Sequence, residues 1–383
     1  EVNMKKVISI ALALLMVAVM LPVMAAAADA EYAITDEARL RAAVSAMKDG
    51  DNVTVRLQND VTVVGKLEVK TGTLTILGQG NTITFSNPNS TMHITGTGIV
   101  NLGTKEGEGN DLTLTSDNIT DSVVYMAGSA VLNMYHGVTI KDSRAGLLAG
   151  GVQLEENSVF NMYGGVIDNC ESLSAVAGGV CIDGGALFNM YDGIIRNCSG
   201  WQGGAVGIPP VDPISGYISG PSGFHMYGGT IRNCHDKWYG GGAVCVYTAE
   251  PVSFIMDGGT ITGCSAVGNG YGGAIFIFTT DSNAVIEINK GEITGNSGVY
   301  GGGVFVYKGT VKIADGVALH NNTATEEGDD LYNESGSVTL GKLPAGLKLA
   351  SSGRDIDGWY HDKKDARWSW EDADQIEKHT EAA

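Results

Sequence analysis

An apolar-x-apolar strand followed by a glycine turn recurs along this chain. The seven copies begin at Leu132, Phe160, Phe188, Phe224, Phe254, Ile286 and Val311. A second short strand follows each copy, centred on Ile140, Ile167, Ile195, Ile231, Ile261, Ile293 and Leu319. Most units then contain a third strand of the GGAV type, with Val or Ile at 152, 180, 206, 244, 275 and 304. The central residues are 27, 28, 36, 30, 32 and 26 positions apart, which predicts three strands per unit with variable loops at the turns.

Within each strand, apolar and polar residues alternate with period 2. Phe160 and Met162 are therefore expected to face a core, and Asn161 and Tyr163 to face outward. One unit cannot bury its apolar row alone, so the units must stack into a solenoid. The pattern predicts an all-β fold, a right-handed single-stranded parallel β-helix of about ten coils. A β-propeller is the structural rival, but its blades need four antiparallel strands, and each unit here shows three.

The flanking segments complete the expected domain plan. Residues 51–347 form the β-helix, with strict repeats at about 120–340 and looser strands before them. Residues 31–50 are expected to form an N-terminal capping helix, because Thr35 and Asp36 can cap it and Leu40, Val44 and Met47 share one face. Residues 348–383 are charged and Trp-rich, and form either a C-terminal cap or the start of a truncated next module.

Residues 1–30 have the pattern of a cleaved signal peptide. Lys5 and Lys6 precede an apolar run over 7–23, and small residues at 26–30 offer cleavage sites. A single uncleaved anchor helix is the alternative. No later segment is long and apolar enough to span a bilayer, so the mature chain is expected to be secreted or held at the bacterial cell surface, without a membrane span.

Composition and charge narrow the classes of partner. Glycine contributes 55 of 383 residues and proline 8, as expected for a chain with many tight turns that is not collagen. The formal net charge is −19. Because phosphate binding needs clustered Lys and Arg, this charge argues against nucleic acid and against an anionic membrane surface.

Two kinds of side-chain row are predicted from the repeat register. Asn169, Asn197, Asn233 and Asn321 follow the second strand, where asparagine tolerates left-handed backbone angles. Cys170, Cys198, Cys234 and Cys264 should stack on consecutive coils, within reach of disulfides. Cys181 and Cys245 are two coils apart with Gly207 between them, too far to bond. Reduced thiols that fill space are favoured over disulfides or metal ligands.

Outward aromatic residues are the main functional signal. Alternation on the third strand places Phe276, Phe278, Phe305, Tyr247 and Tyr307 away from the core. The turns leading into that strand add Trp201, Trp238, Tyr239, Tyr271 and Tyr300. An exposed patch of this size marks an interaction site, and stacking for stability, under cover of the C-terminal segment, is the alternative. The loop 207–223 holds half of the prolines near this face and is a second recognition candidate.

Catalytic and metal-binding signals are weak. The residues after the second strand form a row that reads Lys141, Asp168, Arg196, Arg232, Thr262, Thr294 and His320. Asp168 with Arg196 is the pair that an enzyme would use, and Glu155 with Asp183 is another, although mixed charges on neighbouring coils usually stabilise an exposed sheet. No metal signature, phosphate loop or GxSxG elbow is present, so no metal and no cofactor is expected.

The GGAI-type strands (Gly272 to Ile275, Gly203 to Val206) and the end motif Asn321-Asn322-Thr323-Ala324 with Gly328-Asp329-Asp330-Leu331-Tyr332 carry a resemblance. They resemble β-helix repeats of bacterial surface adhesins of the polymorphic outer-membrane protein type, within the pectate-lyase-like superfold. The family's FxxN half is replaced here by FNMYGG.

The resemblance implies an adhesin or host-interaction protein that binds a host or bacterial surface protein or glycan without catalysis. A polysaccharide lyase or glycoside hydrolase acting on uronic-acid polysaccharides is the first alternative. A structural spacer that displays other domains is the second.

Overall fold

The computed structural model describes residues 29–117, 120–146, 148–173, 176–209, 221–268 and 270–340, together with the backbone of two short strands at 359–360 and 367–368. The expected signal peptide therefore lies almost wholly outside the described residues. So do most of the proline-rich loop and nearly all of the C-terminal segment 348–383.

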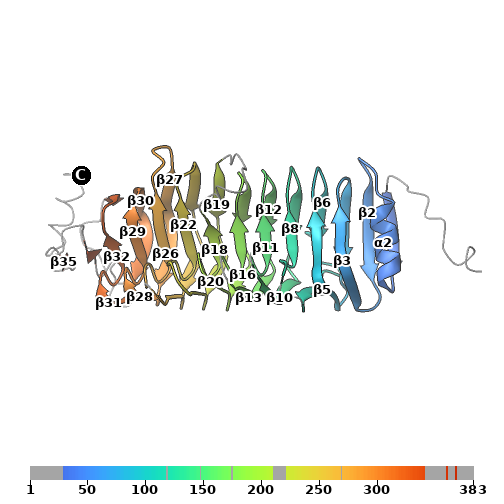
Figure 1. Cartoon of the computed structure of the whole chain (residues 1–383), viewed down its shortest axis with the longest axis horizontal. Helices are drawn as coiled ribbons and strands as arrows, with labels where there is room; N and C mark the ends of the chain where they lie inside the picture. The colour runs from blue at the N-terminus through green and yellow to red at the C-terminus, as the bar shows by residue number, and fades with distance from the viewer. Residues whose placement is uncertain are drawn as a thin grey trace, which may run out of the picture.

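The described chain forms a parallel β-solenoid of about nine turns, drawn out as a rod (Figure 1). Each strand pairs in parallel with its equivalent on the next coil; for example, Phe160 lies beside Phe188, and Phe188 beside Phe224. The predicted fold class is confirmed, and the parallel pairing excludes a propeller. The spacing of the repeats was enough to predict this fold, because stacked coils place equivalent residues side by side.

Three faces run along the rod. The first face contains β1 (Asp29–Ile34), β2 (Asn52–Leu57), β4 (Thr73–Leu77), β6 (Ile99–Leu102), β9 (Val131–Met134), β12 (Val159–Met162), β15 (Leu187–Met190), β19 (Ser222–Met226), β23 (Val252–Met256), the first parts of β27 (Val285–Thr294) and β30 (Thr310–His320), and β33 (Ser337–Leu340). The second face contains the first parts of β3 (Val61–Val69), β5 (Asn81–Ile94), β10 (Val138–Ala145) and β13 (Val166–Ser172), with β7 (Leu112–Ser116), β16 (Ile194–Arg196), β20 (Thr230–Arg232), β24 (Thr260–Thr262) and the last parts of β27 and β30.

The third face carries the aromatic residues. It contains the last parts of β3 and β5, then β8 (Val124–Met126), β11 (Val152–Leu154), β14 (Val180–Ile182), β18 (Val206–Ile208), β22 (Val244–Thr248), β26 (Ile275–Thr279), β29 (Val304–Lys308), β32 (Leu331–Asn333) and β34 (Trp359–Tyr360). Strand β35 (Arg367–Trp368) pairs antiparallel with β34.

A fourth, short row of strands separates the second face from the third, and the sequence did not predict it. It contains the last parts of β10 and β13, then β17 (Ser199–Gly200), β21 (His235–Asp236), β25 (Ser265–Ala266), β28 (Ser297–Tyr300) and β31 (Thr323–Glu327). The chain reaches it through one left-handed residue per coil, with φ between 51° and 66°. That position is filled by Asp142, Asn169, Asn197, Asn233, Gly263, Gly295 and Asn321. The predicted asparagine row is thus a row of kinks. At these positions only Gly, Asn or Asp adopts the left-handed backbone conformation at little energetic cost.

The helix α2 (Glu37–Ser45) lies across the N-terminal end of the solenoid (Figure 1). The Asp36 side chain accepts a hydrogen bond from the backbone N–H of Arg39 at 3.0 Å, so it is the predicted cap. Leu40 and Val44 are buried against the core. Met47 follows the helix and packs partly buried on the same core. The helix covers apolar residues that the first coil would otherwise expose.

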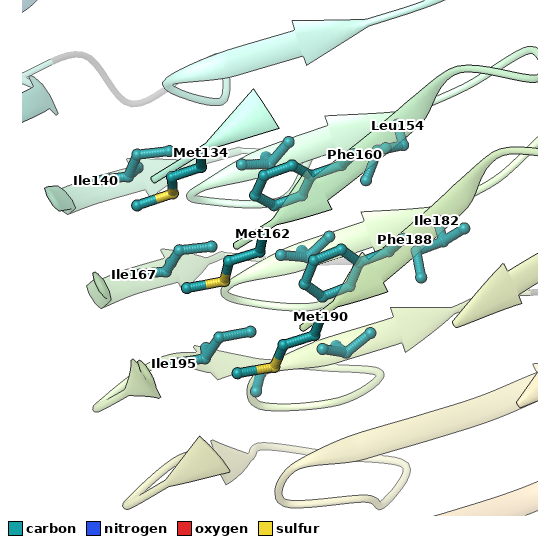
Figure 2. Close-up of a cluster of buried hydrophobic side chains, with 14 of the residues drawn as sticks. Met134, Ile140, Leu154, Phe160, Met162, Ile167, Ile182, Phe188, Met190 and Ile195 are labelled. Carbon is teal, nitrogen blue, oxygen red and sulfur yellow. The ribbon is translucent and has the colours of Figure 1, made fainter. Parts of the chain in front are cut away.

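The interior is filled by rows of identical side chains (Figure 2). The phenylalanine rings of Phe160, Phe188, Phe224 and Phe254 are buried and stacked, with centroids 4.8, 5.1 and 5.6 Å apart in sequence order. Methionines two residues later form a second buried row beside them. Stacked rings at this spacing add to the burial of apolar area.

The six cysteines are buried and free. Gly207 lies between Cys181 and Cys245, as predicted from the register. In the other row, the Cys198 thiol donates to the backbone C=O of Arg196 at 3.2 Å. The row continues as Asn296, whose side-chain amide donates to the equivalent C=O of Thr294 at 3.2 Å. Thiol and amide therefore fill the same buried place, so the row has a structural role.

Candidate functional site

Aromatic rings gather on the outer side of the third face, in the coils of β22, β26, β29 and β32. Val244, Ile275 and Val304 point into the main core, so the residues after them point away from it. A second, separate apolar cluster results, which we call the aromatic cluster. Its buried members are Cys245, Phe276, Phe305 and Tyr332, and Tyr247, Tyr271, Phe278 and Tyr300 pack partly buried against them.

Phe276 and Phe305 require a correction. Both point away from the main core as predicted, but only 5% of Phe276 and 2% of Phe305 is exposed, so neither offers a contact surface. They are stacked on each other at 5.7 Å, and the Tyr271 ring lies 4.8 Å from that of Phe305. The ring of Tyr271, from the turn before β26, lies over both phenylalanines. These two phenylalanines support the surface that the tyrosines form.

The exposed part of this region is made by three other predicted residues. Trp238, Tyr239 and Tyr307 are 48%, 36% and 43% exposed. Tyr239 stacks on Tyr247 at 5.4 Å, and Tyr307 lies 5.5 Å from Phe278. The rings of Trp201 and Trp238 form a pair at 5.6 Å in the turns that lead to β18 and β22. The residues predicted from the sequence therefore do lie together, along several coils.

A pocket of about 260 Å³ opens at the C-terminal side of the aromatic cluster. It is lined by Tyr271, Tyr300, Phe305, Tyr307, Glu327, Tyr332 and Glu334. The Tyr332 hydroxyl donates a hydrogen bond to the Glu334 carboxylate at 2.6 Å. We refer to this site as the tyrosine pocket.

Three lining residues of the tyrosine pocket were missed by the sequence prediction: Glu327, Tyr332 and Glu334. The last coil replaces the glycine-rich strand start by Gly328-Asp329-Asp330, so its third strand did not match the pattern. The register shows the equivalence, because Tyr332 pairs with Phe305 and Glu327 with Tyr300. Aligning Leu331 with Val304 would have found all three.

A second aromatic row lies on the turn after the first face. The rings of Tyr135, Tyr163, Tyr191 and Tyr227 are stacked at 5.2, 4.9 and 4.7 Å and nearly parallel. Each inner ring covers the faces of its neighbours, and His225 stacks on Tyr227 at 3.6 Å. Partial burial raises the pKa of Tyr163. Since mostly ring edges remain exposed, this row stabilises the coil stack.

The pair proposed for an enzyme is an ion pair on the second face. Arg196 donates to one Asp168 oxygen through Nε and Nη2 at 2.9 and 2.7 Å, and Asn197 donates to the other at 2.7 Å. Burial acts to raise the Asp168 pKa, but these hydrogen bonds lower it overall. Both carboxylate oxygens are occupied, which suits a structural link between coils better than a catalytic acid or base.

Glu155 is the carboxyl group with the more unusual environment. Burial raises its pKa, with a further contribution from the negative charge of Asp183 on the next coil. The Tyr125 hydroxyl donates to Glu155 at 2.5 Å. This alternative catalytic pair thus has one carboxyl whose pKa is raised above its ordinary value, and it lies several coils away from the aromatic cluster.

A buried carboxyl lies beside the tryptophan pair. Asp236 is fully buried, and its two oxygens accept backbone hydrogen bonds from Trp238 at 2.9 Å and Gly203 at 3.2 Å. Burial raises the Asp236 pKa to about 8, against the opposing effect of these bonds. The turn that carries Trp238 is therefore tied to a group that titrates near neutral pH.

This pKa predicts a pH-dependent stability. Between its ordinary value of 3.8 and about 8, Asp236 holds a proton in the folded state and loses it on unfolding. The free energy of unfolding should fall as pH rises through that range, by on the order of 1 kcal/mol per pH unit. Urea unfolding across the range should show this slope, and Asp236→Asn should flatten it. The exposed control Asp49→Asn should retain the slope, and equal slopes in all three proteins would contradict the prediction.

Comparisons with known proteins add no family: no family model, no curated protein and no solved structure matches the chain significantly. The fold and the site define a parallel β-solenoid with a surface aromatic cluster. In the part of the chain that the structure describes, no helix is long and apolar enough to cross a bilayer. The same residues contain no group of three or more His, Cys, Asp or Glu side chains placed to hold a metal ion.

Proposed function

We propose that this chain is a secreted or cell-surface bacterial binding protein that contacts a host or bacterial surface protein or glycan without catalysis. The observation that carries the proposal is the aromatic surface on the third face. Trp238, Tyr239 and Tyr307 expose large rings, and Tyr307 also lines the tyrosine pocket. Leaving such rings in water is unfavourable, and exposed aromatic groups with a polar end are typical of contact surfaces.

The structural spacer explains this surface less well. A spacer needs stacked rows, and the buried phenylalanines and the parallel tyrosine row already supply them. The aromatic cluster differs because its outer rings are tilted; Tyr247 and Phe278, for example, are inclined by 45°. Tilted rings leave parts of their faces open, where a ligand can stack.

Alanine at Tyr307 or Trp238 is expected to weaken binding by at least about tenfold, because aromatic residues dominate contact energies. The measurement is binding of the purified chain to mucin, host surface proteins and a glycan array. Tyr191→Ala is the matched control, since it removes a ring of similar exposure from the other row. Phe276 and Phe305 are unsuitable for this test because their replacement would disturb folding.

Two results would overturn the proposal. One is an equal loss of binding in Tyr191→Ala, which would indicate a nonspecific effect. The other is enzymatic activity, seen as unsaturated products or new reducing ends from uronic-acid polysaccharides. Loss of that activity in Glu155→Gln or Asp168→Asn would assign the chain to the lyases or hydrolases.

A further inference from the structure

The tyrosine pocket combines aromatic walls with negative charge. Two rows of aromatic residues approach it along the rod, and each row ends in a glutamate at the same coil. Tyr271 bridges to Tyr300, and Tyr300 pairs with Glu327. In the other row Glu334 follows Tyr307, with its backbone N–H bonded to the C=O of Val306 at 2.9 Å. The pocket is thus lined by aromatic rings together with two carboxylates.

The rings face this space with differing tilts. The Tyr271 ring is inclined by 34° to those of both Tyr300 and Phe305, and the Tyr300 ring by 57° to that of Tyr332, whereas Phe305 lies nearly parallel to Tyr307 and Tyr332. By contrast, neighbouring rings of the row from Tyr163 to Tyr227 lie within 10° of parallel. Tilted rings form the walls of a cavity, and aromatic faces carry a partial negative charge that attracts cations.

The charges around the tyrosine pocket also favour a cation. Among the residues that the structure describes, no lysine or arginine lines the tyrosine pocket. Among the described residues, no ion pair engages Glu327 or Glu334, whereas Arg144, Arg196 and Lys237 are each paired with a carboxylate. An uncompensated pair of carboxylates beside aromatic faces favours a cation. The acidic chain as a whole, with a net charge of −19, adds a long-range attraction.

The shape favours a quaternary ammonium group over a primary amine. A primary ammonium needs up to three hydrogen-bond acceptors, but ring faces are poor ones and Glu334 already accepts from the Tyr332 hydroxyl. A quaternary ammonium spreads its charge over methyl groups and needs contact with ring faces only. The volume of about 260 Å³ is smaller than the roughly 300–1,000 Å³ of sites for drug-sized ligands, so it suits a headgroup.

We propose that the tyrosine pocket binds a quaternary ammonium group of the choline type. This inference rests on the proposed binding function and names the ligand chemistry of one part of the same surface. The role of each residue follows from the geometry: the rings of Tyr271, Tyr300 and Tyr307 contact the methyl groups, while Glu327 and Glu334 supply the charge.

The test is a calorimetric or NMR titration of the full chain with choline and with its neutral isostere, 3,3-dimethylbutan-1-ol. Choline should bind at least about tenfold more tightly than the isostere, because shape is matched and only the charge differs. Glu334→Gln and Tyr300→Ala should each weaken choline binding severalfold. Glu326→Gln removes an exposed carboxylate that does not line the pocket, so it should bind like the unaltered chain.

Each other outcome would overturn the inference. These outcomes are no choline binding, equal binding of the isostere, tighter binding of lysine amide than of choline, or an equal effect of Glu326→Gln. Thermal unfolding of each variant shows whether it is folded. The general binding function is judged separately, by Trp238→Ala against mucin, proteins and glycans, because Trp238 lies outside the pocket.

Discussion

Phe188→Ala should lower the free energy of unfolding by about 3–5 kcal/mol, the usual cost of truncating a buried phenylalanine. The Phe188 ring is fully buried and stacks on that of Phe160 (Figure 2), and the Phe224 ring stacks on its other side. Its removal opens a cavity in the middle of the row and removes both ring contacts. Because neighbouring coils provide the pairing surface for each other, the loss should weaken the coils on either side as well.

Urea unfolding followed by circular dichroism measures this effect, and the same coil contains a matched control. Tyr191 is also stacked between two rings, at 4.9 and 4.7 Å, but it is exposed. Tyr191→Ala should therefore cost about 1 kcal/mol or less. Phe188→Leu should lie between the two, because leucine and isoleucine occur in this row at Leu132 and Ile286. Equal losses in Phe188→Ala and Tyr191→Ala would contradict the prediction, because burial of the phenylalanine row would then add nothing to the free energy of unfolding.

The sequence predicts the fold because one rule, the period of 2 in a strand, is repeated on every coil. Phe160 and Met162 point inward and Tyr163 outward, as expected from alternation alone. Parallel stacking then extends each assignment to the equivalent residues. The cysteine rows, the kinks at asparagine and the pairing of Asp168 with Arg196 follow in the same way.

The site was predicted less completely, since alternation gives the direction of a side chain but not what covers it. Phe276 and Phe305 point away from the core, yet Tyr247, Tyr271 and Tyr332 bury them. Tyr247 and Tyr332 lie in β22 and β32, but Tyr271 comes from a turn of variable length, whose conformation the repeat does not fix. Glu327, at the end of β31, and Glu334, directly after β32, complete the tyrosine pocket; they were missed because the last coil was not aligned with the repeat.

The paired glycines before the third strand are conserved in position from coil to coil for a steric reason. A Cβ atom on Gly242 would lie 2.1 Å from the carbonyl oxygen of Gly273, and one on Gly204 would lie 2.2 Å from that of Gly242. Neither glycine has a left-handed backbone conformation, so close approach between coils is the constraint. The backbone N–H of Gly204 bonds to the C=O of Gly241 at 3.1 Å across this contact.

Gly242→Ala should therefore destabilise the chain by about 3 kcal/mol or more, because the neighbouring atoms are backbone and cannot move independently. Urea unfolding measures the loss, and limited proteolysis should show cleavage near β22 and β26. Gly80→Ala is the control: Gly80 has φ +87° but nothing within 4 Å of its Cβ position, so only backbone strain of about 1–2 kcal/mol is expected. A smaller loss of stability in Gly242→Ala than in Gly80→Ala would mean that the coils can separate at little energetic cost. The glycine motif would then be required for the conformation of the turn, and not for the close spacing of the coils that aligns the aromatic rings of the third face.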